Sequence, residues 1–287
     1  MGRWTNSASP FCDAVLLKRF EPTIRPTDVF LSTFPKCGTT LIQNLLYQLR
    51  EGGDPDVDCI YNHVPYLEYP VDGVSTEERL EQYALLKEPR IFKLHLRFDE
   101  CPYSEVAKYI TCSRDPRDAV VSLFFHQLHL NREYLKEREK LHHFPPRKII
   151  EVFDEFVENW LERGEYWKFL NSWWSRRNHP NTLWSRFEDL LADLPTEVKR
   201  VVDFLKWNVS PDTIEKRILP LLDFEWMKQN ERRFLMDNGK AFSGPFFRKG
   251  KIDRGESSLS NQLRVAILKA ARENLPHECC DFVVGCM

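Results

Sequence analysis

The chain has 287 residues, of which 42% are hydrophobic, so it can bury one large core, and general intrinsic disorder is excluded. Its 41 basic and 43 acidic residues give a formal net charge of −2, which excludes an overall positive field that would attract nucleic acid or an anionic membrane. Any site for an anion must therefore be a local cluster of basic residues.

Apolar runs and cysteine spacing bear on the cellular compartment. No apolar run reaches the length of a signal-peptide core or of a membrane-spanning helix, so we expect no membrane partner. The eight cysteines form no C-x-x-C pair and no zinc-ligand spacing, which favours reduced thiols over disulfides or metal ligands. We therefore predict a soluble, cytoplasmic protein that holds no metal.

The first clear unit is a strand, a tight loop and a helix, which follow an N-terminal arm. We expect the arm, residues 1–27, to be irregular because prolines interrupt it, with room for one short structured piece around residues 14–20. A short apolar strand at residues 29–31 then leads into the loop. Apolar residues recur at helical spacing over residues 41–49, until two glycines end the helix.

The loop at residues 33–40 is predicted to bind phosphate. Unpaired backbone N–H groups and the positive end of the helix dipole favour an anion at such a helix start. Lys36, Thr39 and Thr40 add one cation and two hydroxyls. Cys37 lies at the same helix end, where thiol pKa values are lowered, so we also regard it as a candidate for oxidation that switches binding.

Polar residues alternate with apolar ones along a predicted strand at residues 90–96. By the period of two, Phe92 and Leu94 point to one side of the strand, while Lys93 and His95 point to the other. A buried cation needs a partner or a chemical role, because leaving it unpaired is costly. Either a satisfied polar pair at a strand end or a catalytic pair fits this pattern.

A second anion site is predicted where the strand at residues 108–112 ends. Asp115 can cap the helix that follows, and Pro116 fits its first position. Arg114 lies just before this helix and Ser122 lies about two turns along it, so a guanidinium and a hydroxyl are available to a second phosphate. The alternative is that Arg114 pairs with an acidic residue.

The remaining elements complete an α/β pattern. They are one strand at residues 182–187, and helices within residues 146–177, at 195–205, from 210 towards 227, and around 263–270 before a cysteine-rich tail. Strands that alternate with helices at this spacing indicate a single α/β domain with a central parallel β-sheet flanked by helices.

Residues 229–256 form a long basic stretch with little periodicity. Such long loops are uncommon in compact domains unless they bind something. The basic cluster at its end contains Arg248, Lys249, Lys251 and Arg254, and no larger basic field accompanies them. A clamp for a terminal phosphate of a small ligand is therefore favoured over a nucleic-acid surface.

Two common phosphate motifs do not fit the first loop. In a Walker A loop the lysine directly follows the last glycine, whereas Lys36 precedes Gly38. A thiol phosphatase with the pattern C-x5-R needs arginine at the position that Gln43 occupies. A kinase of the common P-loop type and a thiol phosphatase are both disfavoured, although the P-loop type of fold is not.

Five short motifs, in the same order along the chain, resemble those of the cytosolic sulfotransferases. The family patterns are T-[YF]-P-K-[SA]-G-T-T-W, K-x-H, R-[ND]-x-x-D-x-x-x-S, [FY]-E-D and F-x-R-K-G. The chain matches them, apart from two positions of the first motif, at residues 33–41, 93–95, 114–122, 187–189 and 246–250. Together these motifs are far more specific than any one of them.

The resemblance implies a P-loop-NTPase-like loop that binds phosphosulfate, and a donor, 3′-phosphoadenosine 5′-phosphosulfate (PAPS). It assigns the 5′-phosphosulfate to Lys36, Cys37, Gly38, Thr39 and Thr40. It assigns the 3′-phosphate to Arg114, Ser122, Arg248, Lys249 and Gly250. Around the adenine it places Phe224, Phe246 and Leu41, the last in the position of the family's tryptophan; Phe187 joins the donor site where tyrosine is more frequent.

The resemblance also implies a mechanism. His95, which is expected to titrate near neutrality, acts as the general base for the acceptor. Lys36 stabilises charge on the departing oxygen and Lys93 supports the sulfuryl group, so no metal is needed. The acceptor is expected to be a small, largely apolar phenol, catecholamine, steroid or arylamine, held by aromatic residues within 61–69 and 230–244.

Two other functions stay open at this point. One is a protein of the same fold that binds a nucleotide or small ligand without catalysis, and the other is a small-molecule kinase. The family's dimer motif, K-x-x-x-T-V-x-x-x-E, is not found, so the sequence leaves homodimer formation open. We expect residues 1–287 to form a single sulfotransferase domain in which residues 229–256 are the donor-binding loop.

Overall fold

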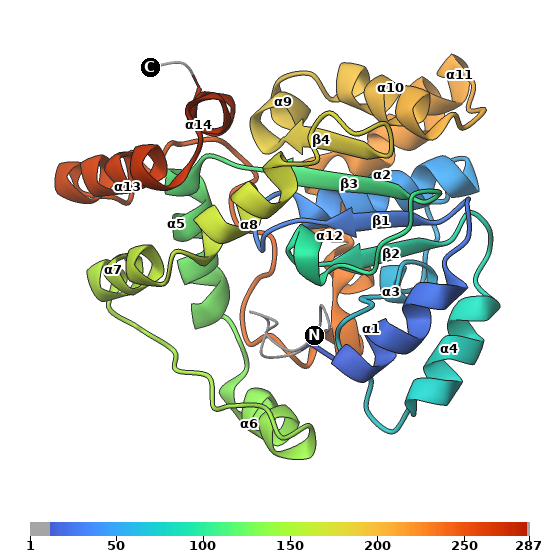
Figure 1. The fold of residues 1–287 in the computed structure, drawn as a ribbon, viewed down its shortest axis with the longest axis horizontal. Helices are drawn as coiled ribbons and strands as arrows, with labels where there is room; N and C mark the ends of the chain where they lie inside the picture. The colour runs from blue at the N-terminus through green and yellow to red at the C-terminus, as the bar shows by residue number, and fades with distance from the viewer. Residues whose placement is uncertain (1–11, 286–287) are drawn as a thin grey trace.

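Four parallel strands form the centre of the fold, in a computed structural model that describes residues 12–285 (Figure 1). The strands are β1 (Val29–Ser32), β2 (Ile91–Leu94), β3 (Lys108–Ser113) and β4 (Thr182–Arg186). Their order in the sheet is β2-β1-β3-β4, and every neighbouring pair is parallel. The predicted α/β fold with a central parallel sheet flanked by helices is confirmed.

Helices cover both faces of this sheet. On one face, Phe30 and Phe92 share a buried core with α1 (Ala14–Phe20), α4 (Thr76–Ala84), α5 (Pro116–Leu128), α7 (Phe153–Arg163), α8 (Glu165–Trp174), α13 (Asn261–Asn274) and α14 (His277–Val284). On the other face, Leu31 and Ile91 share a core with α2 (Thr39–Glu51), α3 (Ile60–His63), α9 (Phe187–Ala192), α10 (Leu194–Leu205) and α12 (Phe224–Gln229). The predicted alternation along β2 is therefore observed.

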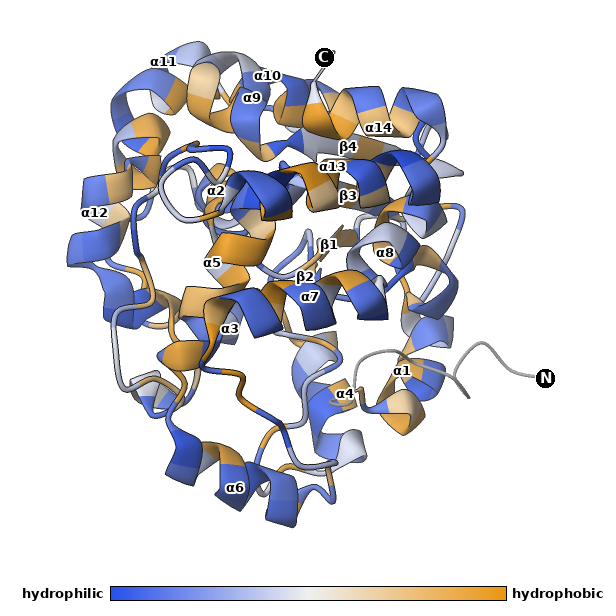
Figure 2. Cartoon of the chain, turned by 90° about the vertical axis from the view of Figure 1, so that its left-hand side faces the viewer, coloured by the Kyte–Doolittle hydropathy of each residue, from blue (hydrophilic) through white to orange (hydrophobic). Residues whose placement is uncertain are grey.

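Figure 2 shows which helices lie at the surface. Helix α13 is hydrophilic on part of its surface and hydrophobic on the rest, whereas α5, between the outer helices and the sheet, is hydrophobic over most of its visible length. Helix α6 (Arg132–Leu141) lies at the edge of the molecule and is mostly hydrophilic. Within residues 12–285, no helix is both long and apolar enough to cross a lipid bilayer.

Helix boundaries follow the capping residues in the sequence. Helix α2 ends at Gly52, whose left-handed backbone (φ 69°) lets its N–H bond to the carbonyl of Gln48. Helix α5 begins after Asp115, whose side chain accepts the backbone N–H of Arg117 at 2.9 Å. The helices predicted after the first and third strands are both confirmed.

The N-terminal segment contains the short structured piece that the sequence allowed. Helix α1 begins after Asp13, whose side chain accepts the backbone N–H of Leu16 at 3.0 Å, and a 3₁₀ turn (Glu21–Thr23) follows it. Phe20 is fully buried against the sheet, so tertiary packing stabilises a helix too short to persist alone. The first part of the predicted arm, residues 1–11, lies outside the described residues.

Three predicted boundaries differ from the structure. The strand at residues 182–187 ends at Arg186, and Phe187 begins α9. The helix expected from residue 210 towards 227 is divided into α11 (Pro211–Thr213), a π turn (Ile214–Ile218), a 3₁₀ turn (Leu219–Leu222) and α12. Pro220 and the new cap at Asp223 account for this break. The cysteine-rich tail, for which no helix was predicted, forms α14, and this helix is held against the core by the buried side chains of Cys279 and Cys280.

An ion pair at the amino ends of β1 and β2 provides a test of this fold. The guanidinium of Arg90 donates to both carboxylate oxygens of Asp28, at 2.8 and 2.5 Å, and both side chains are buried. Replacing Asp28 by Ala leaves this cation buried without its partner. We expect the free energy of unfolding, measured in urea, to fall by about 3–5 kcal/mol.

The exposed pair between Lys148 and Glu155 (3.4 Å) is the matched control. Exposed ion pairs contribute little, so Lys148→Ala should leave the free energy of unfolding within experimental error. Equal losses in the two variants would contradict a special role for the buried pair.

Candidate active site

The four strands end at a common edge of the sheet, where the sequence motifs meet. Because the strands are parallel, their carboxyl ends lie side by side. β1 runs into the loop at residues 33–38, β2 into His95, β3 into Arg114 and β4 into Phe187. β1 has β2 on one side and β3 on the other, so the order of the strands reverses here. Ligands of open α/β sheets bind at such a point.

The loop before α2 leaves the start of this helix open to an anion. Gly38 occupies the N-cap position with a φ of 82°, and no side chain caps the helix, so its first N–H groups have no intrahelical partner. A β-carbon on Gly38 would lie 2.9 Å from the Phe187 ring, which leaves no room for a side chain. Lys36 also has a left-handed backbone (φ 71°), which is strained for a residue other than glycine.

Arg114 joins this loop to the long loop after α12. Its side chain is 7% exposed and donates to the carbonyl oxygens of Lys36 at 3.1 Å and of Lys251 at 3.3 Å. Its guanidinium also lies 4.4 Å from the centre of the Phe187 ring. Its buried Nε has no hydrogen-bond partner among residues 12–285. Within that range Arg114 pairs with no acidic residue, so the alternative prediction is wrong there.

The basic end of the long loop packs against α5 and α12. The guanidinium of Arg248 lies 4.6 Å from the centre of the Phe125 ring, and repulsion from Arg114 adds to burial in lowering its pKa. A β-carbon on Gly250 would lie 2.3 Å from the Phe224 ring, so glycine is needed here as well. Ser122 is half-buried on α5, about one turn before Phe125. Of the predicted 3′-phosphate residues, Arg114, Ser122 and Arg248 therefore lie beside or on α5, whereas Gly250 packs against α12.

Two further contacts hold this basic end in place. Asp118, which is buried on α5, accepts the backbone N–H groups of Asp253 and Gly255 at 3.1 and 3.2 Å. Lys249 is exposed and donates to the hydroxyl of Ser257 at 3.3 Å. Nothing local in the sequence indicates these long-range partners of Asp118, which lies in the first turn of α5.

Lys36 meets a residue that the sequence did not single out. Its ammonium lies 3.4 Å from Nδ1 of His126 and 4.7 Å from the centre of the Phe246 ring. Burial lowers the pKa of Lys36 to about 7, and the charges of Arg114, Lys93 and Arg248 act in the same direction. His126 follows Ser122 by one helical turn on the same side of α5, which is the signal that was available in the sequence.

His95 is held in one tautomer at the end of β2. Its Nδ1 lies 2.7 Å from the carbonyl oxygen of Thr33, which can only accept, so Nδ1 carries the proton and the lone pair is on Nε2. Burial lowers the pKa of His95 to about 3, with Lys93 and Lys36 adding repulsion. The expected titration near neutrality is therefore wrong, and the imidazole is neutral at physiological pH.

Lys93 lies between two tyrosines. Its ammonium is 3.1 Å from the hydroxyl of Tyr61 and 4.2 Å from the centre of the Tyr66 ring, and burial lowers its pKa to about 8. The buried carboxyl of Glu68 accepts the backbone N–H of His95 at 3.0 Å, and burial raises its pKa to about 8. Lys93 and His95 thus have separate partners and do not satisfy each other as a pair.

The two rings expected around the adenine lie apart, one on α12 and one in the long loop. Phe224 lies against Gly250 and 6.1 Å from Phe247 between ring centres, whereas Phe246 lies over Lys36. Leu41 is half-buried and packs against the core on the α2 face of the sheet. Phe246 is therefore at the phosphosulfate end of the predicted donor site, and Phe224 is at the end with the basic loop.

Cys37 is enclosed rather than reactive. Its side chain is fully buried, and its sulfur lies 3.9 Å from the Tyr166 hydroxyl. Burial raises the pKa of the thiol to about 12, because it outweighs the attraction of the nearby Arg114 charge. A thiolate is the form that oxidises readily, so the prediction of an oxidisable, activated thiol is wrong.

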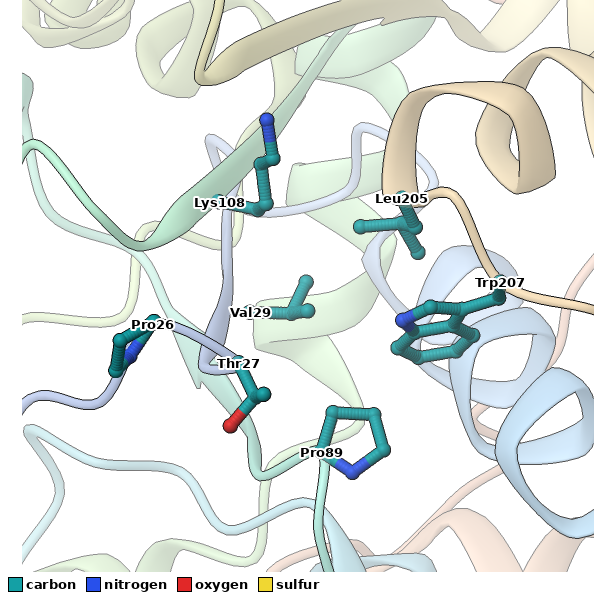
Figure 3. Close-up of a pocket in the computed structure, with 7 residues that line it drawn as sticks. All are labelled: Pro26, Thr27, Val29, Pro89, Lys108, Leu205 and Trp207. Carbon is teal, nitrogen blue, oxygen red and sulfur yellow. The ribbon is translucent and has the colours of Figure 1, made fainter.

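The pocket in Figure 3 is separate from this site. It lies at the amino ends of β1 and β3, around Val29 and Lys108, with Trp207 on its far side. The clustered cations lie instead at the carboxyl ends of the strands. Among the residues that the structure describes, no three His, Cys, Asp or Glu side chains are placed to hold a metal ion.

Comparisons with known proteins agree on one family. The model of the sulfotransferase domain matches residues 26–276. Sulfotransferase 4A1 of Mus musculus is 30% identical over 215 residues, which cover 73% of this chain and 70% of that protein. Sulfotransferase 1E1 of Mus musculus is 28% identical over 256 residues, which cover 84% of this chain and 80% of the relative.

Solved structures show the same fold. Retinol dehydratase, in a complex with retinol and PAP, superposes with a TM-score of 0.70 at 25% identity over 88% of this chain and 82% of its own. Mouse sulfotransferase SULT7A1, complexed with PAP, superposes with a TM-score of 0.72 over 96% of each chain; its 19% identity supports the fold alone. With the family model matching most of its length, the chain belongs to the sulfotransferase family.

Proposed function

We propose that this protein transfers the sulfuryl group of PAPS to a hydroxyl or amine of a small, largely apolar acceptor, with His95 as the general base. As a member of its family the chain is a sulfotransferase, and PAPS is its co-substrate. One observation supports the role of His95. A neutral imidazole with a fixed tautomer lies beside two ammonium groups at the carboxyl edge of the sheet.

The proposed donor site is suited to an anion because three of its cations, in the part of the chain that the structure describes, have no carboxylate partner. Lys36, Arg114 and Arg248 repel one another, and within residues 12–285 none of them pairs with a carboxylate. An anion that binds among them removes this repulsion. The open start of α2 adds backbone N–H donors at residues 38–40, whereas the N–H of Cys37 already donates to the carbonyl of Phe34 at 3.2 Å.

The two ends of the donor are assigned to two ends of this cluster. Lys36 and the N–H groups at residues 38–40 bind the 5′-phosphosulfate. Arg114, through its unpartnered Nε, binds the 3′-phosphate together with the long loop at residues 229–256, which is the donor-binding loop. The residues that bind the 3′-phosphate together with Arg114 are Ser122, Arg248, Lys249 and, through its backbone, Gly250. Leu41, Phe187 and Phe224 supply apolar surface for the adenine.

Proton transfer in this site is the task of His95. Its Nε2 accepts the proton of the acceptor hydroxyl as the acceptor oxygen attacks sulfur in line with the departing phosphate oxygen. Burial, with repulsion from Lys93 and Lys36, holds the pKa of His95 at about 3. The repulsive part is relieved when negative charge is bound beside the two lysines, because an adjacent anion favours imidazolium. Lys36 stabilises the departing oxygen, and Lys93 stabilises the sulfuryl oxygens.

The acceptor faces aromatic walls. The Tyr66 ring meets the His95 ring edge to face, with 5.3 Å between ring centres. Phe242 and Phe246 form a second aromatic group, which packs on His126. Flat rings of this kind suit a phenol, a catecholamine or a steroid. Retinol dehydratase has been solved with retinol and with androsterone, which supports an apolar acceptor here.

The first prediction concerns His95. His95→Ala should lower turnover by about 10²–10⁴-fold, because no group is left to take the proton, while the affinity for adenosine 3′,5′-bisphosphate (PAP) stays the same. Turnover is measured with labelled PAPS across phenols, catecholamines, steroids and arylamines, and PAP affinity by calorimetry.

His179, which lies beyond the amino end of β4, is the control, and His179→Ala should keep turnover. Near-wild-type turnover in His95→Ala would refute the general base. Tight PAP binding by the wild type without transfer to any acceptor would instead indicate a binding protein on this fold.

The second prediction concerns the phosphate clamp. Arg248→Ala and Lys249→Ala should each weaken PAP by about tenfold or more, the effect of one charge-assisted hydrogen bond, and adenosine 5′-phosphate far less. Calorimetry with both nucleotides measures the difference. Lys269→Ala, which changes an exposed lysine on α13 outside this loop, is the control and should change neither affinity. Equal losses for the two nucleotides would rule out a 3′-phosphate contact.

The third prediction follows from the lowered pKa of Lys36. Its ammonium is the form that binds phosphate, so the bound pKa lies above the free value of about 7. PAP affinity should therefore be full below about pH 7 and fall as the pH rises through that value. At about pH 8, calorimetry in buffers of different ionisation enthalpy should show proton uptake on binding, which Lys36→Arg should reduce. Absence of uptake in the wild type would show that Lys36 stays charged without ligand.

A further inference from the structure

His126 has a contact that the proposed mechanism does not use. It lies near the end of α5, half-buried, with its Nδ1 3.4 Å from the ammonium of Lys36. An ammonium has only donors, so Nδ1 accepts and the imidazole carries its proton on Nε2. The ring also packs against Phe242 and Phe246, with 5.1 and 6.0 Å between ring centres. This packing holds Nδ1 of His126 towards the ammonium of Lys36.

The charged groups around this contact all favour a neutral imidazole. Lys36 is faced by Arg114 from the start of α5, by Lys93 from β2 and by Arg248 from the long loop, with the buried Cys37 beside it in its own loop. His126 is faced by Lys36, Lys93, His95 and Arg147, and burial and these charges hold its pKa well below its usual value. His126 is therefore neutral and adds no further positive charge beside Lys36.

The neutral character of this partner matters because the donor is an anion. A carboxylate beside Lys36 would attract the ammonium strongly, and it would repel the phosphosulfate. A neutral nitrogen takes one of the three ammonium N–H groups and leaves the positive charge uncompensated. The two remaining N–H groups are then available to the donor.

We propose that His126 is a positioning residue for donor binding, which accepts one hydrogen bond from Lys36 and orients the rest of its ammonium towards the 5′-phosphosulfate. The inference rests on the proposed function, since it assigns the phosphosulfate to Lys36. It gives His126 no contact with the acceptor and no part in proton transfer from it.

Two variants separate the hydrogen bond from the packing. His126→Asn keeps an acceptor near the position of Nδ1 and loses the ring, whereas His126→Phe keeps a ring against Phe242 and Phe246 and loses the acceptor. At about pH 6.5 Lys36 is charged in the free enzyme, and His126→Phe should still bind PAP several-fold more weakly because the ammonium is no longer oriented, whereas His126→Asn should bind PAP like the wild type. At about pH 8.5 the free lysine is neutral, and His126→Phe should bind PAP about tenfold more weakly.

His126→Asn should keep most of the wild-type affinity at the higher pH. The pH at which PAP affinity begins to fall should move down in His126→Phe and stay in place in His126→Asn. The control is His129→Phe. His129 is on the same helix and bonds through Nδ1 to the carbonyl of Pro245 in the long loop at 2.9 Å, so this variant disturbs the loop without touching Lys36. It should leave the pH dependence unchanged.

Calorimetric PAP titrations at both pH values, with KM for donor and acceptor, decide the matter. Weaker binding by His126→Asn than by His126→Phe would overturn the proposal, because packing would then be the contribution of this residue. A changed acceptor KM with unchanged PAP affinity would also overturn it and would place His126 in the acceptor site. Failure of the wild type to bind PAP would refute the proposed donor site instead, so the two failures are distinguishable.

Discussion

The rest of the site depends on positive charge that is gathered at one edge of the sheet and left without carboxylate partners. Within residues 12–285, Lys36 contacts an imidazole and a ring, and Lys93 contacts a hydroxyl and two rings. Arg114 contacts two carbonyls and a ring, and Arg248 contacts a ring. Neutral partners hold these side chains in place without cancelling their charge. The folded protein therefore has a standing affinity for an anion at this edge.

Three buried arginines elsewhere in the fold have carboxylate partners. Arg90 pairs with Asp28, Arg79 pairs with Asp13, and Arg138 pairs with Asp72. The first pair joins the amino ends of β1 and β2, the second joins α4 to the start of α1, and the third joins α6 to the segment around Asp72. A buried cation costs free energy unless something compensates it, and in these places the carboxylate does so within the protein. At the carboxyl edge of the sheet the compensation is left to the ligand, which links donor binding to the stability of the loops around it.

The same charges act on His95, which we propose as the general base. Burial, together with Lys93 and Lys36, keeps His95 neutral in the free protein, and the carbonyl of Thr33 decides which nitrogen carries the lone pair. Binding of an anionic donor cancels part of this repulsion, so the basicity of His95 increases at the stage when a proton has to be removed. His126 remains neutral beside Lys36 by the same physical effect. Charge, rather than any single hydrogen bond, thus couples donor binding to the chemistry.

Sequence by itself determined the parallel α/β architecture and the family, because hydrophobic periodicity, caps at Asp115 and Gly52 and five short motifs are local features. It also indicated that Lys36, Lys93, His95 and Arg114 belong to sites. Only the tertiary structure decided their protonation and partners. The low pKa of His95, the inert thiol of Cys37, the position of Phe246 over Lys36 and the contact with His126 all arise from burial and from segments up to 210 residues apart in the chain. Desolvation and Coulomb repulsion depend on distances in space, which spacing along the chain does not contain.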